Sequence, residues 1–201
     1  MTTVSFIPQV VNSVPRLFAE AVAELHAFAW APAIIVEEID APRHLGPFSA
    51  AIAADLCLHG DDVGSAKLIL LHDPAGRVEW GGTFRCVTYA SAKIGPELVH
   101  DPFLPSVAWS WLVDGLDHQQ AEYAAPSGTV TLIDSTPFGS IESSGSTSEL
   151  EIRASWTPIL DDADSFDAHL KAWQELVCLV AGVPPLVDGV VPLTRRLEPR
   201  P

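Results

Sequence analysis

The sequence predicts an α+β fold in which a mostly antiparallel sheet of about six strands carries its helices mainly on one face. Two observations support this prediction. Short runs of alternating apolar and polar residues are separated by turn-forming residues, as in strands joined by hairpins. Three other segments repeat apolar residues at every third or fourth position, as amphipathic helices do. The resulting order is α-β-β-β-β-α-β-β-α, and such runs of strands favour antiparallel pairing.

The first helix is expected to begin at Ser13 and to end before Pro32. Serine is a favourable N-cap, and Pro15 suits the first turn because its missing N–H has no helical partner there. The apolar stripe of this helix consists of Leu17, Phe18, Ala21, Val22 and Leu25.

Four strands are expected next, over residues 34–39, 48–59, 67–72 and 82–92. The second of them alternates along its length, although its alanines also permit a helix. Turns are expected over residues 60–65 and at Asp73-Pro74-Ala75-Gly76, whose residue types suit a type I turn. The third and fourth strands are therefore predicted to form a hairpin.

A second helix is expected after Pro105, with two further strands around Val130 and Ile152 that are joined by the Ser/Gly-rich residues 135–148. Acidic residues from Asp161 onward suit the positive N-terminus of a last helix, which ends at Gly182. The apolar stripe of the last helix consists of Phe166, Leu170, Trp173, Val177 and Val180.

Length and charge limit the domain organisation and the partners. The 201 residues suit one domain, which we expect over residues 13–185, with a flexible N-terminus (1–12) and a polar, partly disordered tail (186–201). With 26 acidic against 11 basic side chains, the chain has a formal net charge of −15 and repels phosphate backbones and anionic lipids. We therefore expect neither nucleic acid nor membrane as a partner, and a cytoplasmic location; the sequence leaves the oligomeric state open.

Motifs for cofactors, metals and catalysis are missing from the sequence. The cysteines Cys57, Cys86 and Cys178 are scattered and suit a reducing compartment, so we predict no metal site and no cofactor. Ser110, Asp114 and His118 repeat at four-residue spacing, but a catalytic triad requires histidine between serine and acid, and here it lies at one end. A solvated helix face with an Asp–His pair is the better interpretation.

Two arginines are candidate binding residues because basic side chains are scarce. Arg85 and Arg153 each lie in the middle of a predicted strand and alternate with apolar residues. If helices cover the apolar side, both arginines face the open side of the sheet and can present a guanidinium group to a carboxylate or to an acidic partner segment. The alternative is structural pairing across strands with Glu37, Glu79 or Glu151.

Four aromatic side chains complete the candidate set. Trp111 lies on a different side of its helix from the core stripe, and Trp80 precedes a glycine pair in the hairpin, so each marks either packing or a binding patch. His72 and His44 are the candidates for an acid/base group beside the Pro-rich connection. None of these residues lies in a known catalytic motif.

Several segments resemble a known family. These are LILLHDPAGRVEWGGTFRCVTYA, DPFLPSVAWSWL, PSGTVT, EIRASWTP and HLKAWQELVCLVAGVPP. In this order and spacing they resemble the actinobacterial family designated domain of unknown function three thousand. The resemblance covers nearly the whole chain and implies a cytosolic single-domain protein, with no activity, cofactor or catalytic residue to carry over.

Two functions follow from these observations. The first is a non-catalytic module that binds a protein or a small molecule on an open sheet face or at the edge marked by Trp111. The element order is also similar to that of type III secretion chaperones, with an additional strand, although fold order says little about function. The alternative is a small-molecule enzyme of hydrolase type, with His44 or His72 as acid/base in a pocket at the sheet edge.

Overall fold

The computed structural model describes residues 14–42, 44–161 and 165–183. Its elements are α1 (Arg16–Ala27), β1 (Ile34–Glu38), β2 (Phe48–Leu58), β3 (Asp61–Arg77), β4 (Gly82–Ile94), α2 (Leu104–His118), β5 (Tyr123–Ser135), the 3-10 helix η1 (Gly139–Ser144), β6 (Thr147–Pro158) and α3 (Asp167–Val180). The predicted α+β class and the predicted order of helices and strands are confirmed.

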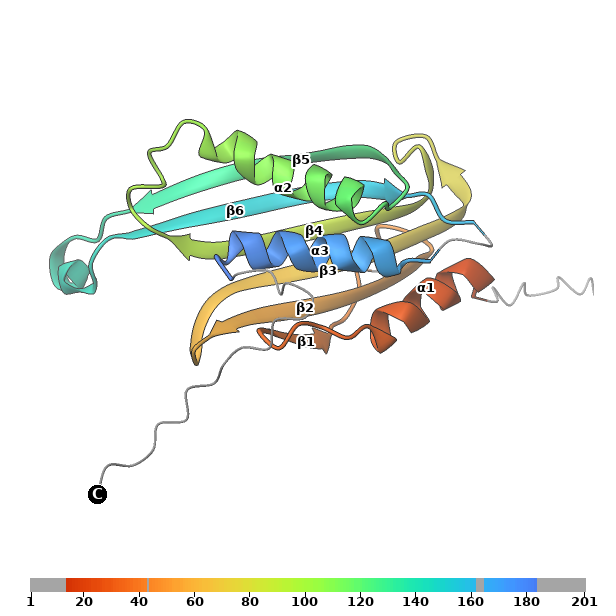
Figure 1. Ribbon diagram of the computed structural model, residues 1–201, viewed down its shortest axis with the longest axis horizontal. Helices are drawn as coiled ribbons and strands as arrows, with labels where there is room; N and C mark the ends of the chain where they lie inside the picture. The colour runs from red at the N-terminus through yellow and green to blue at the C-terminus, as the bar shows by residue number, and fades with distance from the viewer. Residues whose placement is uncertain (1–13, 43, 162–164, 184–201) are drawn as a thin grey trace, which may run out of the picture.

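All strand pairs are antiparallel, and they form one six-stranded sheet in the order β1-β2-β3-β4-β6-β5. The first four strands are neighbours in sequence. The chain then crosses through α2 to the far edge, where it forms β5, and returns as β6 between β5 and β4 (Figure 1). The connection from β4 to β5 must pass over the position of one strand, and a helix can do so while it packs on the sheet.

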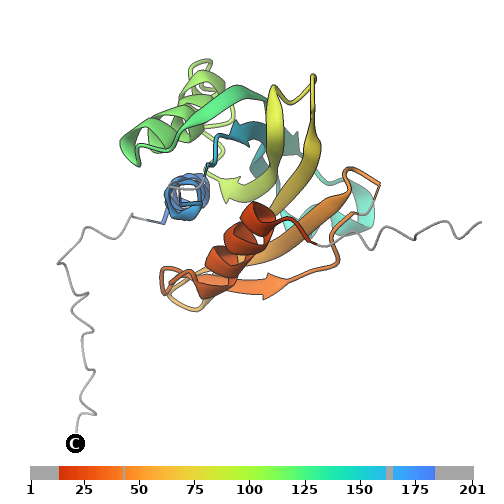
Figure 2. The same ribbon diagram turned by 90° about the vertical axis from the view of Figure 1, so that its right-hand side faces the viewer.

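The three α-helices lie on the same face of the sheet, with α3 between α1 and α2 (Figure 2). The predicted stripe of α3 is confirmed, since Phe166, Leu170, Trp173, Val177 and Val180 are all buried. Alternate residues of the central strands, such as Leu68 and Ile152, meet this stripe. The opposite face of the sheet has no α-helix over it among the described residues.

The two turns expected at residues 73–76 and 60–65 do not lie where the sequence predicted them. Asp73 to Gly76 do not reverse the chain: β3 continues to Arg77, and pairing resumes there after a bulge, with Arg77 opposite Gly82. Asp73 Oδ1 accepts the backbone N–H of Ala75, so the residues typical of a turn close a local loop inside the strand instead.

The other displaced turn lies between β2 and β3. His59 and Gly60 both have positive φ (56° and 96°) and form a two-residue connection, so the strand begins at Asp61 and not after Ser65. Positive φ at both positions matches the twist of the flanking strands, which is why such a short reversal is stable.

The predicted helix boundaries also need correction. Pro15 is the N-cap of α1, and the helix ends at Ala27 because Phe28 is extended, well before Pro32. Ser13 lies outside the described residues, as do Asp162, Asp164 and the predicted terminal segments 1–12 and 186–201. The last helix begins at Asp167, so Asp161 precedes it.

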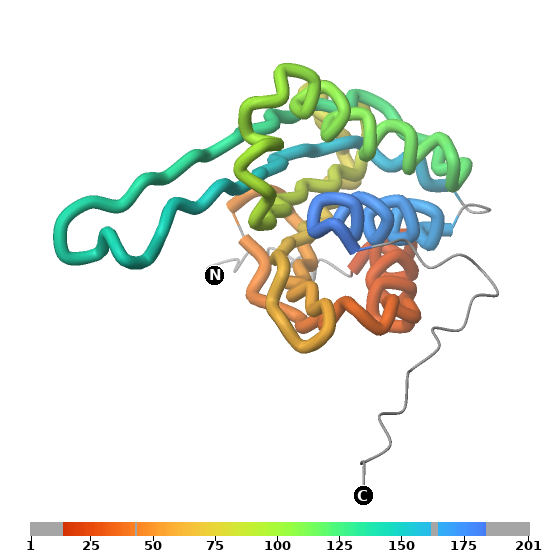
Figure 3. Tube along the Cα trace, turned by 60° about the vertical axis from the view of Figure 1, so that its left-hand side comes forward, coloured from red at the N-terminus to blue at the C-terminus, as the bar shows by residue number. Residues whose placement is uncertain are grey.

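The Ser/Gly-rich residues 135–148 form the end of the hairpin between β5 and β6. This hairpin projects beyond the body of the protein, with η1 at its tip (Figure 3). Phe138 and Ile141 are exposed there. Within the described part of the chain, no helix combines the length and the apolar character needed to cross a membrane.

Candidate functional site

The uncovered face of the sheet carries a row of polar side chains across its central strands. Lys67 of β3, Tyr89 of β4 and Arg153 of β6 lie directly opposite one another in register, and Thr129 of β5 follows Arg153. Side chains opposite one another in an antiparallel sheet lie on the same face. Tyr89 is therefore flanked by one cation on each side.

Glu151 holds this row together. Its two carboxylate oxygens accept the hydroxyl of Tyr89 at 3.2 Å and Nη2 of Arg153 at 2.8 Å. The Arg153 guanidinium also lies 5.7 Å from the centre of the Tyr89 ring, which is cation–π distance. The Glu151 side chain is 13% exposed and the Arg153 side chain 64% exposed, so Arg153 keeps most of its surface available to a partner. We call Lys67, Tyr89, Glu151 and Arg153 the central row.

Two lysines of this face have no ion-pair partner among the described residues. Arg16, Arg77 and Lys171, which lie elsewhere, each form an ion pair with an acid four residues away. Lys67 and Lys93 are exposed on the uncovered face, and neither forms an ion pair with any described residue. Glu149, opposite Lys93, and Glu151 lie on the same face, so cationic and anionic side chains are interspersed there.

Acidic residues border the central row on the β1 and β2 side. Glu37 and Asp55 are exposed on the same face, opposite Ala53 and Ser65 respectively. In register, Ala53 lies between Glu37 and Lys67, so this acidic border is one strand away from the central row.

Arg85 lies on the same face as Arg153 but is buried, with 8% of its surface exposed. Its Nη1 donates to the carbonyl of Ala125 (2.9 Å) and to the hydroxyl of Thr157 (3.0 Å). Its Nη2 donates to the hydroxyls of Ser127 (2.9 Å) and Ser155 (2.7 Å). No carboxylate of the described residues pairs with it, and desolvation lowers its pKa. Arg85 thus links β4 to β5 and β6, and both of its terminal nitrogens are already hydrogen-bonded.

The geometry of β5 explains this burial. Pairing between β5 and β6 shifts between Ala124 and Ser127, and Ala125 has a positive φ of 48°. This bulge lets the Ala125 carbonyl leave the ladder and accept the Arg85 bond. Neutral acceptors satisfy the charge without a buried ion pair.

Trp80 is a structural residue of the β3–β4 turn. It is buried, and its backbone carbonyl accepts the hydroxyl of Thr157. The Arg77 guanidinium lies 4.6 Å from the centre of its ring, and Arg77 Nε also pairs with Asp73 at 2.9 Å. Thr157 therefore connects the β3–β4 turn to the hydrogen bonds of Arg85.

His72 lies in an aromatic cluster on the helix side of the sheet. Its ring is 4.2 Å from the ring of Phe84 and 5.9 Å from that of Phe18, centre to centre. Nδ1 is fully buried and has no hydrogen-bond partner among the described residues, and desolvation lowers the pKa of the ring. A sealed, neutral imidazole has no access to a substrate.

The other two predicted residues lie apart from His72. His44 is exposed in the connection between β1 and β2. Trp111 is half-buried on α2 and packs against the core, in line with the exposed Val107 and Phe103, which lie one and two turns earlier. The structure thus brings Arg85 and Arg153 to one sheet face and places His44, His72 and Trp111 elsewhere.

The serine, aspartate and histidine of α2 do not act together. Ser110 donates to the Val107 carbonyl, and Nδ1 of the exposed His118 lies 3.4 Å from Glu175 of α3. The expected pair of Asp and His is therefore replaced by a contact between helices. Across residues 14–42, 44–161 and 165–183, no group of three or more His, Cys, Asp or Glu side chains is arranged to hold a metal ion.

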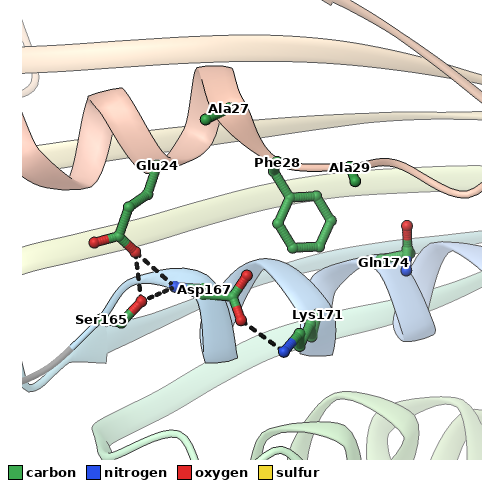
Figure 4. Close-up of a pocket in the computed structure, with 8 residues that line it drawn as sticks. All are labelled: Glu24, Ala27, Phe28, Ala29, Ser165, Asp167, Lys171 and Gln174. Atoms are coloured by element: carbon green, nitrogen blue, oxygen red, sulfur yellow. Dashed lines mark hydrogen bonds and ion pairs between the residues drawn. The ribbon is translucent and has the colours of Figure 1, made fainter.

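A groove of about 380 Å³ runs between α1 and α3 (Figure 4). Glu24 of α1 accepts the hydroxyl of Ser165 at 2.6 Å and the backbone N–H of Asp167 at 3.0 Å, and thereby caps the N-terminus of α3. Asp167 pairs with Lys171 at 2.7 Å, and Gln174 accepts a backbone N–H from the segment after α1. The polar groups of this groove hold the two helices together.

His169 is a buried polar residue that the sequence analysis did not single out. The indole N–H of Trp156 donates to its Nδ1 at 3.2 Å, and desolvation lowers the pKa of the ring to about 4. Its position was visible in the sequence, because it falls on the apolar side of α3 between Phe166 and Trp173. A histidine on an apolar stripe is the signal that identifies such a residue.

Comparison with known proteins places the chain in a family. Residues 14–191 match the model of the family described as "Protein of unknown function (DUF3000)". Searches of curated proteins and of solved structures found no significant match. The match spans most of the chain and agrees with the resemblance carried by the sequence segments. The chain belongs to the DUF3000 family.

Proposed function

We propose that this chain is a non-catalytic binding module whose uncovered sheet face receives an acidic segment of a partner protein. The central row supports this most directly, because Lys67 and Arg153 flank Tyr89 in register while both remain exposed. Arginine and lysine bind carboxylates, and tyrosine adds a rigid apolar surface with a polar tip.

The surroundings of the row suit a polypeptide better than a small molecule. Val87 and Ile69 lie beside the row on the same face and are only half-buried. An extended acidic segment can place carboxylates over Lys67 and Arg153 while its apolar side chains cover these residues. Interfaces commonly combine such an apolar centre with a charged border.

The enzyme alternative has less support. His72 is buried among aromatic rings and His44 is exposed to solvent, and neither lines the groove between α1 and α3. An acid/base residue needs both access to substrate and an aligned partner. The net charge of −15 also disfavours nucleic acid and anionic membranes, and the cytoplasm stays our prediction for the location.

An NMR titration tests the proposal. Three peptides of equal length are used, one rich in Glu and Asp, one rich in Lys and one uncharged. We expect the acidic peptide alone to shift the backbone amides of Lys67, Tyr89 and Arg153 in a saturable way. Shifts confined to α2 or to the groove between α1 and α3 would assign binding to another surface, and no saturable shift would refute an acidic partner.

A further inference from the structure

A second hollow, separate from the uncovered face, lies where α2 ends and α3 begins. It measures about 230 Å³. Its wall includes His169 and Asp167 of α3, Glu122 before β5, and Ile159 after β6. Segments distant in sequence thus meet around one small space.

His169 lines this hollow and carries a hydrogen-bond donor on its ring. Its ring is buried, with 1% of the residue exposed. Because Nδ1 accepts the Trp156 N–H, the proton of the neutral ring is on Nε2. Nε2 has no hydrogen-bond partner among the described residues.

Nε2 also keeps access to the hollow. The one fully buried polar side-chain atom without a partner among the described residues is Nδ1 of His72. Nε2 of His169 is therefore not sealed, and His169 lines the hollow. A buried imidazole whose N–H has no partner can donate a hydrogen bond to a ligand that enters the adjoining cavity.

Glu122 also lines the hollow, and its carboxylate has no partner among the described residues. It is exposed, and its side chain forms no ion pair or hydrogen bond with a described residue. Asp167 lies on the same wall and is paired with Lys171. The hollow thus combines one neutral donor with negative charge, which disfavours an anionic ligand.

From these two unpaired groups we infer that the hollow binds a small primary amine that also carries a carbonyl oxygen. The carbonyl accepts the Nε2–H of His169, and the ammonium group lies beside the Glu122 carboxylate. A transition metal is excluded by the tautomer, because a metal requires the Nε2 lone pair that the proton occupies. The lowered pKa of His169, about 4, keeps the ring neutral at pH 7, so the ring does not repel the ammonium group.

Glycinamide is the probe, since it holds an amine and an amide carbonyl in a molecule small enough for the hollow. Side-chain ¹⁵N spectra report the tautomer of His169 and the environment of Nε2. We expect saturable shifts of the His169 ring at millimolar glycinamide. Ethylamine lacks the carbonyl and N-acetylglycinamide lacks the cationic amine, so each should bind about tenfold more weakly or worse.

Glu122→Gln provides the genetic test, because Glu122 is exposed and the change keeps the shape of the side chain. It should weaken glycinamide binding about tenfold, whereas the control Glu142→Gln, on η1, should not change it. The inference is overturned if glycinamide leaves the His169 ring unshifted, if Glu122→Gln binds as wild type does, or if ethylamine binds as tightly as glycinamide. The uncovered sheet face does not enter this test, so its outcome is independent of the proposed function.

Discussion

The indole N–H of Trp156 donates to Nδ1 of His169 across 3.2 Å between the sheet and α3. This bond fixes a buried imidazole as a neutral Nε2–H donor, so His169 is not available as a base through Nε2. Burial of the same ring lowers its pKa by desolvation and thereby links the stability of the protein to pH.

Acidification should destabilise the protein through His169. Its pKa is about 4 in the folded state against an ordinary value of 6.5. Because the unfolded state binds the proton first, this contribution is complete above pH 6.5 and is lost progressively as the pH falls toward 4, by about 3 kcal/mol in total. Urea denaturation of wild type and His169→Gln at a series of pH values measures it. The stability difference between the two proteins should shrink with acidification, and a constant difference would contradict the assignment.

Arg85→Met should destabilise far more than Arg153→Met. The first removes a buried guanidinium and leaves the acceptors on Ala125, Ser127, Ser155 and Thr157 without their donor, which costs about 1–3 kcal/mol for each acceptor that stays unsatisfied. The second removes an exposed ion pair that contributes at most about 1 kcal/mol. Chemical denaturation of both variants gives the comparison. Similar unfolding midpoints would show that the Arg85 network does not hold the strands together.

The cysteines should react in a defined order. Cys57 is half-buried, whereas burial raises the pKa of Cys86 well above its ordinary value and that of Cys178 to about 11. β3 lies between the strands that carry Cys57 and Cys86, so those two do not form a disulfide. Titration with a thiol reagent should label Cys57 alone in the native protein and all three after unfolding. Rapid labelling of Cys86 in the native state would be inconsistent with its burial.

Trp173→Ala should cost about 3–5 kcal/mol of stability, against less than about 0.5 kcal/mol for His118→Ala. Trp173 is fully buried, and its indole N–H donates to the hydroxyl of Thr88 at 2.7 Å. His118 is exposed and contacts only the surface acid Glu175 and its neighbour Gln119 among the described residues. Denaturant midpoints of the two variants decide the matter, and equal values would mean that the buried side of α3 is wrongly assigned.

The regular elements were predictable from the sequence because their periodicity is local. The stripe of α3 from Phe166 to Val180 and the alternation of β4 each identify a buried side without knowledge of the rest of the chain. The turn at Asp73 was misplaced because the same residue types form a reversal or a bulge, and the pairing of β3 with β4 decides which.

The candidate site was predictable only in part. Strand alternation places Arg153 on the uncovered face, but the burial of Arg85 depends on the β5 bulge at Ala125, which no local pattern reveals. The role of β5 as the outer edge strand follows from a crossover between distant segments. The hollow at His169 likewise forms only when the ends of α2, β6 and α3 meet.

Binding of an acidic polypeptide to the central row is tested most directly by charge reversal. The measurement is the dissociation constant of a labelled Glu-rich peptide, by fluorescence anisotropy, for wild type, Arg153→Glu and the control Arg16→Glu. Arg16 is as exposed as Arg153, at 58% against 64%, and its reversal changes the net charge equally, but it lies on α1. We expect Arg153→Glu to weaken binding about tenfold or more, and Arg16→Glu to bind nearly as wild type does. Equal binding by wild type and Arg153→Glu, or equal losses in both variants, would contradict it.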